Sequence, residues 1–167
     1  MITELTRMWL TRSTKPFLFK NEYDQELPFS DCDGLGLYVH IPFCRSICSF
    51  CPYCKTLYSE EACSRYIDAL IREIHLAGSQ APGKKTVTSL YFGGGTPALA
   101  ADRIKEIIDA IQEHFIITQG IGIELHPENV TPRTLHISKE AGITKLSIGI
   151  QSFQEKFQKL LGRTWIR

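Results

Sequence analysis

The chain has 167 residues, of which 43% are hydrophobic, and its formal net charge is +1 at pH 7. This size allows one hydrophobic core, and the near-neutral charge argues against nucleic acid as a partner. No apolar run approaches the roughly 20 residues that span a bilayer, and Glu4 and Arg7 interrupt the segment where a signal peptide would be apolar. We therefore expect a soluble, cytoplasmic protein with no membrane partner, whose six cysteines are reduced thiols or metal ligands.

Residues 1–34 are mixed in character and are predicted to form an N-terminal extension that packs across the edge of the domain. Aromatic side chains are scattered among charged ones, and the segment ends in the turn-forming residues 30–34. Cys32 lies in this turn and is expected to be an ordinary thiol with no metal to bind. Residues 35–167 then form the core domain.

A largely apolar run from Leu35 to Ile41 predicts a buried parallel strand, which Pro42 ends. Directly behind it come four of the six cysteines, Cys44, Cys48, Cys51 and Cys54. The first three have the spacing C-x3-C-x2-C, which lets three thiolates converge on one inorganic centre. Because a cubane iron–sulfur cluster has four irons, three cysteines leave one iron open to a substrate. This spacing favours a reactive cluster over one that only carries electrons.

Other uses of these cysteines remain open from the residues alone. A zinc site could take Cys54 as its fourth ligand, because Cys51 and Cys54 have the C-x2-C spacing of structural zinc sites. The same pair could form a redox dithiol, while disulfide pairing would need an exported protein. His40 precedes the cysteines and is expected to be a hydrogen-bonded structural histidine, in preference to a metal ligand.

Helices and strands alternate after the cysteines. Apolar spacing predicts helices over residues 60–78, 101–115 and 132–141, separated by strands over residues 86–92, 121–125 and 144–150. Ser152 and Glu155 have capping-box spacing, which predicts a last helix through Leu161. Cys63 lies on the apolar face of the first helix and is expected to pack in the core. No functional role is predicted for three histidines in the helical segments, His75, His114 and His136.

This alternation predicts parallel βαβ units, whose functional residues collect at the carboxyl ends of the strands. The cysteines, the glycines of YFGGGTP, Glu124 and Gln151 each lie at such an end, which predicts one shared site. Glycines there let backbone N–H groups approach a ligand closely. Glu124 stands in an otherwise apolar strand and needs a partner, because burying an unpaired carboxylate is costly.

The strings YVHIPFC with C-x3-C-x-F-C, YFGGGTP and GITKLSIGIQSF resemble the motifs of radical S-adenosylmethionine enzymes. They are most similar to the branch of oxygen-independent coproporphyrinogen III oxidase with its heme-chaperone and methyltransferase relatives. The resemblance runs from Tyr38 to Arg163 and implies an α/β fold in which parallel βα units form part of a (β/α)6 barrel, with about four of six units present. Since members of this family are more than twice as long, we expect a core that is truncated at its C-terminus.

The resemblance implies a 4Fe-4S cluster bound by Cys44, Cys48 and Cys51, while Cys54 departs from the commonest motif and is not expected to bind it. It also implies S-adenosylmethionine contacts from Tyr38, Phe50, Gly94, Gly95, Thr96, Glu124, Gln151 and Arg163. No catalytic residue acting on the substrate is identified.

The family's chemistry implies an oxidoreductase that receives an electron from a low-potential donor and generates a 5′-deoxyadenosyl radical. The expected substrate is a small molecule, a tetrapyrrole whose propionate side chains are oxidatively decarboxylated in porphyrin biosynthesis. Other possibilities are a heme chaperone or methyltransferase of the same family, an inactive fragment, and a zinc-binding structural domain.

Overall fold

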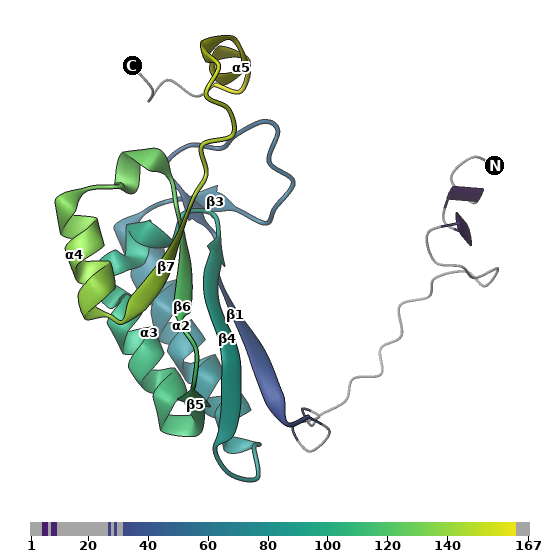
Figure 1. The fold of residues 1–167 in the computed structure, drawn as a ribbon, viewed down its shortest axis with the longest axis vertical. Coiled ribbons are helices and arrows are strands. Elements are labelled where there is room, and N and C mark those ends of the chain that lie inside the picture. Colours follow the sequence, from purple (N-terminus) through teal and green to yellow (C-terminus); the bar gives the residue numbers. More distant parts are fainter. Residues whose placement is uncertain (1–4, 7, 10–26, 28, 30–31, 163–167) are drawn as a thin grey trace.

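The structure, a computed structural model, describes residues 5–6, 8–9, 27, 29 and 32–162. Its centre is a parallel sheet with the strand order β1, β4, β6, β7, in which β5 also pairs with β4 (Figure 1). The strands are β1 (Gly34–Ile41), β4 (Lys85–Gly94), β5 (Phe115–Ile117), β6 (Ile121–Leu125) and β7 (Ile143–Ile148). The predicted α/β class with parallel strands is confirmed.

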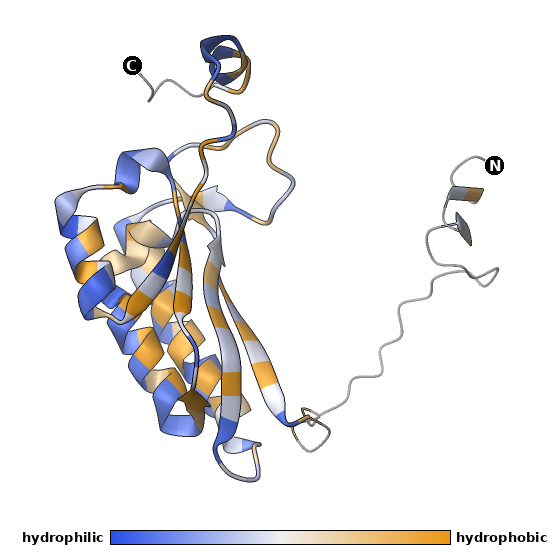
Figure 2. Cartoon of the chain, in the orientation of Figure 1, coloured by the Kyte–Doolittle hydropathy of each residue, from blue (hydrophilic) through white to orange (hydrophobic). Residues whose placement is uncertain are grey.

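Three helices return the chain between strands and lie along one face of the sheet (Figure 1). They are α2 (Glu60–Ser79), α3 (Ala101–His114) and α4 (Pro132–Glu140). Apolar and polar residues alternate along them, as the spacing predicts (Figure 2). Ser59 Oγ accepts the Ala62 N–H at 3.2 Å and thereby caps the start of α2. The described residues contain no helix whose length and apolar content together would let it span a membrane.

The core lies between these helices and the sheet. Its largest fully buried side chains include Ile41, Ile67, Leu90, Phe92, Ile104, Ile107, Ile111 and Ile123. Cys63 is buried in this core, as predicted. Phe29 packs on Phe115 with ring centroids 6.0 Å apart. The remainder of the predicted N-terminal extension lies largely outside the described residues.

Several predicted boundaries are displaced by one or two residues. The helix predicted to reach Phe115 ends at His114, because Phe115 adopts extended backbone angles (φ −131°, ψ 158°) and begins β5. β5 has only three residues, too few for the alternation that identifies a strand in a sequence. The strand predicted to reach Ile150 ends at Ile148.

The capping box predicted from Ser152 and Glu155 is wrong. The last helix, α5 (Glu155–Leu160), begins after Gln154, whose side chain makes no capping hydrogen bond. Ser152 Oγ instead accepts the Gln154 N–H at 3.1 Å, only two residues away. The backbone of Gln151 is left-handed, with a φ of 67°, and it turns the chain before the helix can begin.

Candidate cofactor-binding site

Residues 44–56, the cysteine loop, begin and end in two short paired strands. β2 (Phe43–Cys44) and β3 (Thr56–Leu57) pair in parallel. The Thr56 N–H donates to the Pro42 carbonyl at 2.8 Å, and the Tyr58 N–H donates to that of Cys44 at 2.9 Å. Both ends of the loop are therefore fixed to the chain that leaves β1.

His40 holds the loop from the side of the sheet. Its Nε2 makes a 2.9 Å hydrogen bond with the carbonyl of Cys54, and its own carbonyl accepts the Tyr66 hydroxyl at 2.7 Å. The predicted structural role of His40 is confirmed. Cys54 is exposed, and its backbone makes this contact while its thiol lies outside the pocket described below.

The glycine turn after β4 lies against the cysteine loop. The Gly95 N–H donates to the Ile41 carbonyl at 2.8 Å, and the Thr96 N–H donates to that of Phe43 at 2.7 Å. A Cβ on Gly95 would lie 2.6 Å from the Phe43 carbonyl oxygen, and Gly94 has a φ of +120°. We expected these N–H groups to face a ligand, but those of Gly95 and Thr96 bond within the protein. Glycine is required here because two backbone segments touch.

The cysteine loop, the glycine turn and the ends of β6 and β7 surround one open pocket of about 380 Å³. Its lining includes the predicted site residues Cys44, Cys48, Cys51, Gly94, Gly95, Thr96, Glu124 and Gln151. They come from the carboxyl ends of β1, β4, β6 and β7, where a parallel sheet collects functional residues. The fold therefore brings the three candidate metal ligands together with most of the candidate cofactor contacts.

Three other predicted contacts are not placed in this pocket. Tyr38 is 60% exposed, stacks near Tyr91 at a centroid distance of 6.5 Å, and does not line it. Phe50 is 38% exposed and likewise does not line it. Arg163 lies outside the described residues. Their roles stay predictions.

Glu124 finds the partners that its place in an apolar strand requires. The Tyr91 hydroxyl donates to its Oε1, and the Gly94 N–H donates to its Oε2, each at 3.4 Å. The side chain is half-buried. These two contacts orient the carboxylate toward the glycine turn and into the pocket.

The thiol of Cys44 lies in surroundings that disfavour a free thiolate. Burial raises its pKa, and the neighbouring Cys48 and Cys51 add to the rise, against a smaller lowering from the Thr96 hydroxyl and from Lys55. Thr96 Oγ1 lies 4.0 Å from the Cys44 sulfur. A bound metal centre would supply the positive charge that stabilises this thiolate.

Several lining residues escape the sequence reasoning, among them Arg45, Lys55, His126, Asn129 and Ser147. Ser147 carries the clearest missed signal, because it is a polar residue between Leu146 and Ile148 inside a predicted strand. The register of β6 and β7 pairs it directly with Glu124. Arg45 and Lys55 add two cationic side chains to the lining that holds the three cysteines.

The family of the chain follows from direct comparison. The model of the Radical SAM superfamily matches residues 38–166, so the chain belongs to this superfamily. The solved structure of coproporphyrinogen III oxidase (HemN) from Escherichia coli is similar, with a TM-score of 0.71 and 31% identity over 80% of this chain and 31% of that one. This likeness places the fold among radical SAM folds.

Two further relatives are named for other activities. The chain is 39% identical to anaerobilin synthase of Escherichia coli O157:H7 over 132 residues, which cover 77% of this chain and 30% of the relative. It is 32% identical to the heme chaperone HemW of Bacillus subtilis over 132 residues, which cover 75% of this chain and 34% of the relative. The chain thus spans about a third of the length of the proteins it matches.

Proposed function

We propose that the chain is a radical S-adenosylmethionine oxidoreductase of the oxygen-independent coproporphyrinogen III oxidase type. Cys44, Cys48 and Cys51 would hold a 4Fe-4S cluster, and S-adenosylmethionine would occupy the rest of the pocket. The observation that carries this proposal is the convergence of the three cysteines with Glu124 and Gln151, which come from separate strand ends, on one pocket. Membership in the superfamily supports both cofactors.

The spacing of the cysteines favours a cluster over a single zinc ion. Two thiolates on one zinc ion lie at most about 4.6 Å apart, because each Zn–S bond is about 2.3 Å long. Among the described residues, no set of three ligand atoms that includes a loop cysteine lies within 4.8 Å of one another. A cluster binds each thiolate through a different iron, so its protein ligands stand farther apart.

The other pocket residues have the chemistry to hold an amino acid end. The Glu124 carboxylate can accept hydrogen bonds from an ammonium group, and the Gln151 amide can both donate and accept. Gln151 has a left-handed backbone, which is uncommon for a residue with a side chain and is concentrated at functional sites. When bound, the cluster and S-adenosylmethionine would supply one-electron reduction, with the electron drawn from the external donor, and a radical that abstracts hydrogen from the substrate.

A tetrapyrrole is the proposed substrate, with oxidative decarboxylation of propionate side chains as the reaction. Two relatives support this class of substrate, since one is a coproporphyrinogen III oxidase and another a heme chaperone. Heme delivery is the second candidate, favoured by the HemW likeness.

The proposed partners are the tetrapyrrole and a low-potential electron donor. We place the protein in the cytoplasm, where six cysteines remain reduced.

Anaerobic reconstitution with iron and sulfide tests the proposal. We expect roughly 4 iron and 4 sulfide per chain and, after reduction in the presence of S-adenosylmethionine, release of 5′-deoxyadenosine. Tight zinc binding at the loop with no uptake of sulfide would contradict it. Adding coproporphyrinogen III or heme to the reconstituted protein then separates the two candidates: loss of carbon dioxide from the first indicates the oxidase, and stoichiometric heme binding without turnover indicates delivery.

A further inference from the structure

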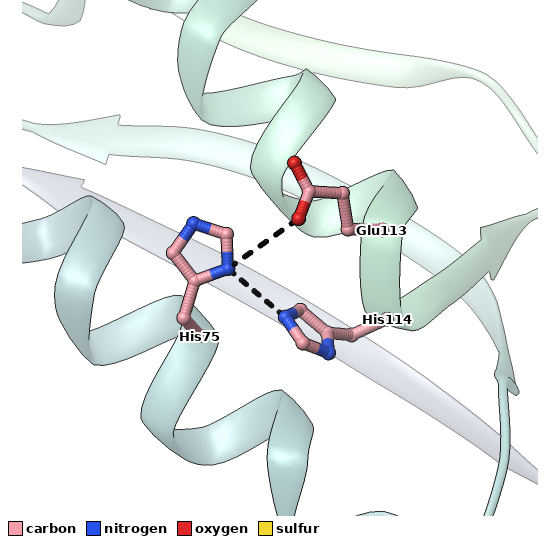
Figure 3. Close-up of side chains that lie close together, drawn as sticks. All are labelled: His75, Glu113 and His114. Carbon is pink, nitrogen blue, oxygen red and sulfur yellow. Dashed lines mark hydrogen bonds and ion pairs between the residues drawn. The ribbon is translucent and has the colours of Figure 1, made fainter.

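Three side chains of types that can bind a metal ion lie together at the opposite end of β4 from the pocket. His75 is near the end of α2, while Glu113 and His114 are the last two residues of α3 (Figure 3). The residue after them, Phe115, pairs with Lys85 at the start of β4, whereas the glycine turn is at the end of that strand. At about 3.3 Å per residue, β4 separates the two places by about 30 Å.

The three side chains, which come from α2 and α3, point toward one another (Figure 3). His75 Nδ1 lies 3.0 Å from His114 Nε2 and 3.8 Å from Glu113 Oε2. All three ligand atoms lie within 4.8 Å of one another. Nitrogen and oxygen ligands placed tetrahedrally around zinc stand about 3.4 Å apart. The described residues contain no other such group.

Gly78 shapes the position of His114. A Cβ at this residue would lie 2.3 Å from His114 Cγ, so the imidazole occupies the space that a side chain on α2 would fill. Gly78 is within α2, and it is not among the glycines with positive φ, so it does not act as a left-handed helix terminator. Glycine is unfavourable inside a helix, and the packing of His114 gives its presence here a physical reason.

We propose that His75, Glu113 and His114 form a binding site for a zinc-class divalent metal ion that joins α2 to α3. Two imidazoles and one carboxylate form a zinc site with an open fourth position, which water or an outside ligand would fill. The side chains of His75 and Glu113 are 40% and 66% exposed, so an ion can reach them from solvent. On binding, each imidazole carries its hydrogen on the nitrogen that faces away from the ion. The site uses none of the pocket residues.

Zinc titration of the full chain tests this site once the loop thiols cannot compete. Cys44, Cys48, Cys51 and Cys54 are replaced together by serine, and zinc binding is measured by equilibrium dialysis. We expect one ion per chain and a higher Tm in the presence of zinc, because the ion binds the folded state. Cobalt bound in place of zinc should show d–d bands without a thiolate charge-transfer band.

Single substitutions added to the four-serine variant, called the background below, identify the zinc ligands. His75→Asn and His114→Asn should each weaken zinc binding at least about tenfold, and Gly78→Ala should weaken it by displacing His114. The matched control is His136→Asn on α4, an exposed histidine far from Glu113 in the chain, which should bind zinc like the background. Equal binding by the His75 and His136 variants would overturn the proposal, as would a background that binds no zinc. The Tm without metal shows whether each variant is folded.

Discussion

The pocket lies at the carboxyl ends of the strands, and the histidine pair, His75 and His114, lies at their opposite ends. These two places are assembled in different ways. The pocket is built from short continuous motifs, each of which follows one strand, so its residues can be found in the sequence. The histidine pair has no motif, because His75 and His114 are 39 residues apart and meet only through the packing of α2 on α3. Functional residues that follow strand ends can be recognised in a sequence, whereas residues that meet only where two helices pack cannot.

The largest effect is expected from the cysteines of the pocket. Cys44→Ala, Cys48→Ala or Cys51→Ala should each abolish the cluster, because each removes one iron ligand. Cys54→Ala should retain it, since this thiol lies outside the pocket. Iron and sulfide analysis after anaerobic reconstitution measures the outcome.

His75→Asn should leave the cluster content unchanged in the same assay, because His75 and the pocket are at opposite ends of β4. A full cluster in the Cys48 variant would refute the ligand assignment. A lower cluster content in the His75 variant would show that the two ends of the domain are coupled.

Thiol alkylation compares the open cysteine loop with the closed core behind it. Cys54 is exposed, whereas Cys63 is 5% exposed and burial raises the pKa of its thiol. At neutral pH we expect Cys63 to react at least about a hundredfold more slowly than Cys54, since the thiolate is the nucleophile. Mass spectrometry of iodoacetamide-treated protein gives both rates. The rate at Cys63 should still rise at pH values above the usual thiol pKa of about 8.5, and similar rates at the two sites would mean that the core opens readily.

Gly95→Ala tests whether contact between the glycine turn and the cysteine loop holds the pocket together. The new Cβ would lie 2.6 Å from the Phe43 carbonyl oxygen, so one of the two segments must move. We expect a loss of about 2 kcal/mol in the free energy of unfolding, seen as a Tm lower by about 4–8 °C.

Gly36→Ala in β1 is the matched control for this variant. A Cβ there would have none of the described atoms within 4 Å, so the substitution should be neutral or slightly stabilising. Equal Tm values for the two alanine variants would show that the contact between the turn and the loop is unimportant for stability.

The smallest effect is expected for Tyr91→Phe. It removes the hydroxyl that donates to Glu124 at 3.4 Å, a long hydrogen bond. We expect the affinity for S-adenosylmethionine to fall about two- to fivefold, which corresponds to somewhat under 1 kcal/mol, with little change in Tm. Isothermal titration of the reconstituted protein measures it. Tyr58→Phe is the control and should leave the affinity unchanged, because the Tyr58 ring packs on Phe43 and the contact to Glu124 comes from Tyr91.

Most of the fold is predictable because its elements are long and strongly periodic. The cap at Ser59 and the strand ends at Ile41 and Leu125 lie where local chemistry places them. The failures are short or lie next to irregular backbone. β5 has three residues, and the left-handed Gln151 displaces the start of α5 from the position that Ser152 predicts. Neither a three-residue strand nor a single φ value leaves a periodic trace in the sequence.

The three candidate cluster cysteines and the strand ends around them can be found in the sequence, because parallel strands bring their carboxyl ends to one side of the sheet. The contact of Gly95 with the cysteine loop and the meeting of His75 with His114 can be seen only in the tertiary structure. The close approach of Gly95 to Phe43 and of Gly78 to His114 depends on the distance between segments far apart in the chain. That distance is set by the packing of whole elements on a shared core, which local residue patterns do not record.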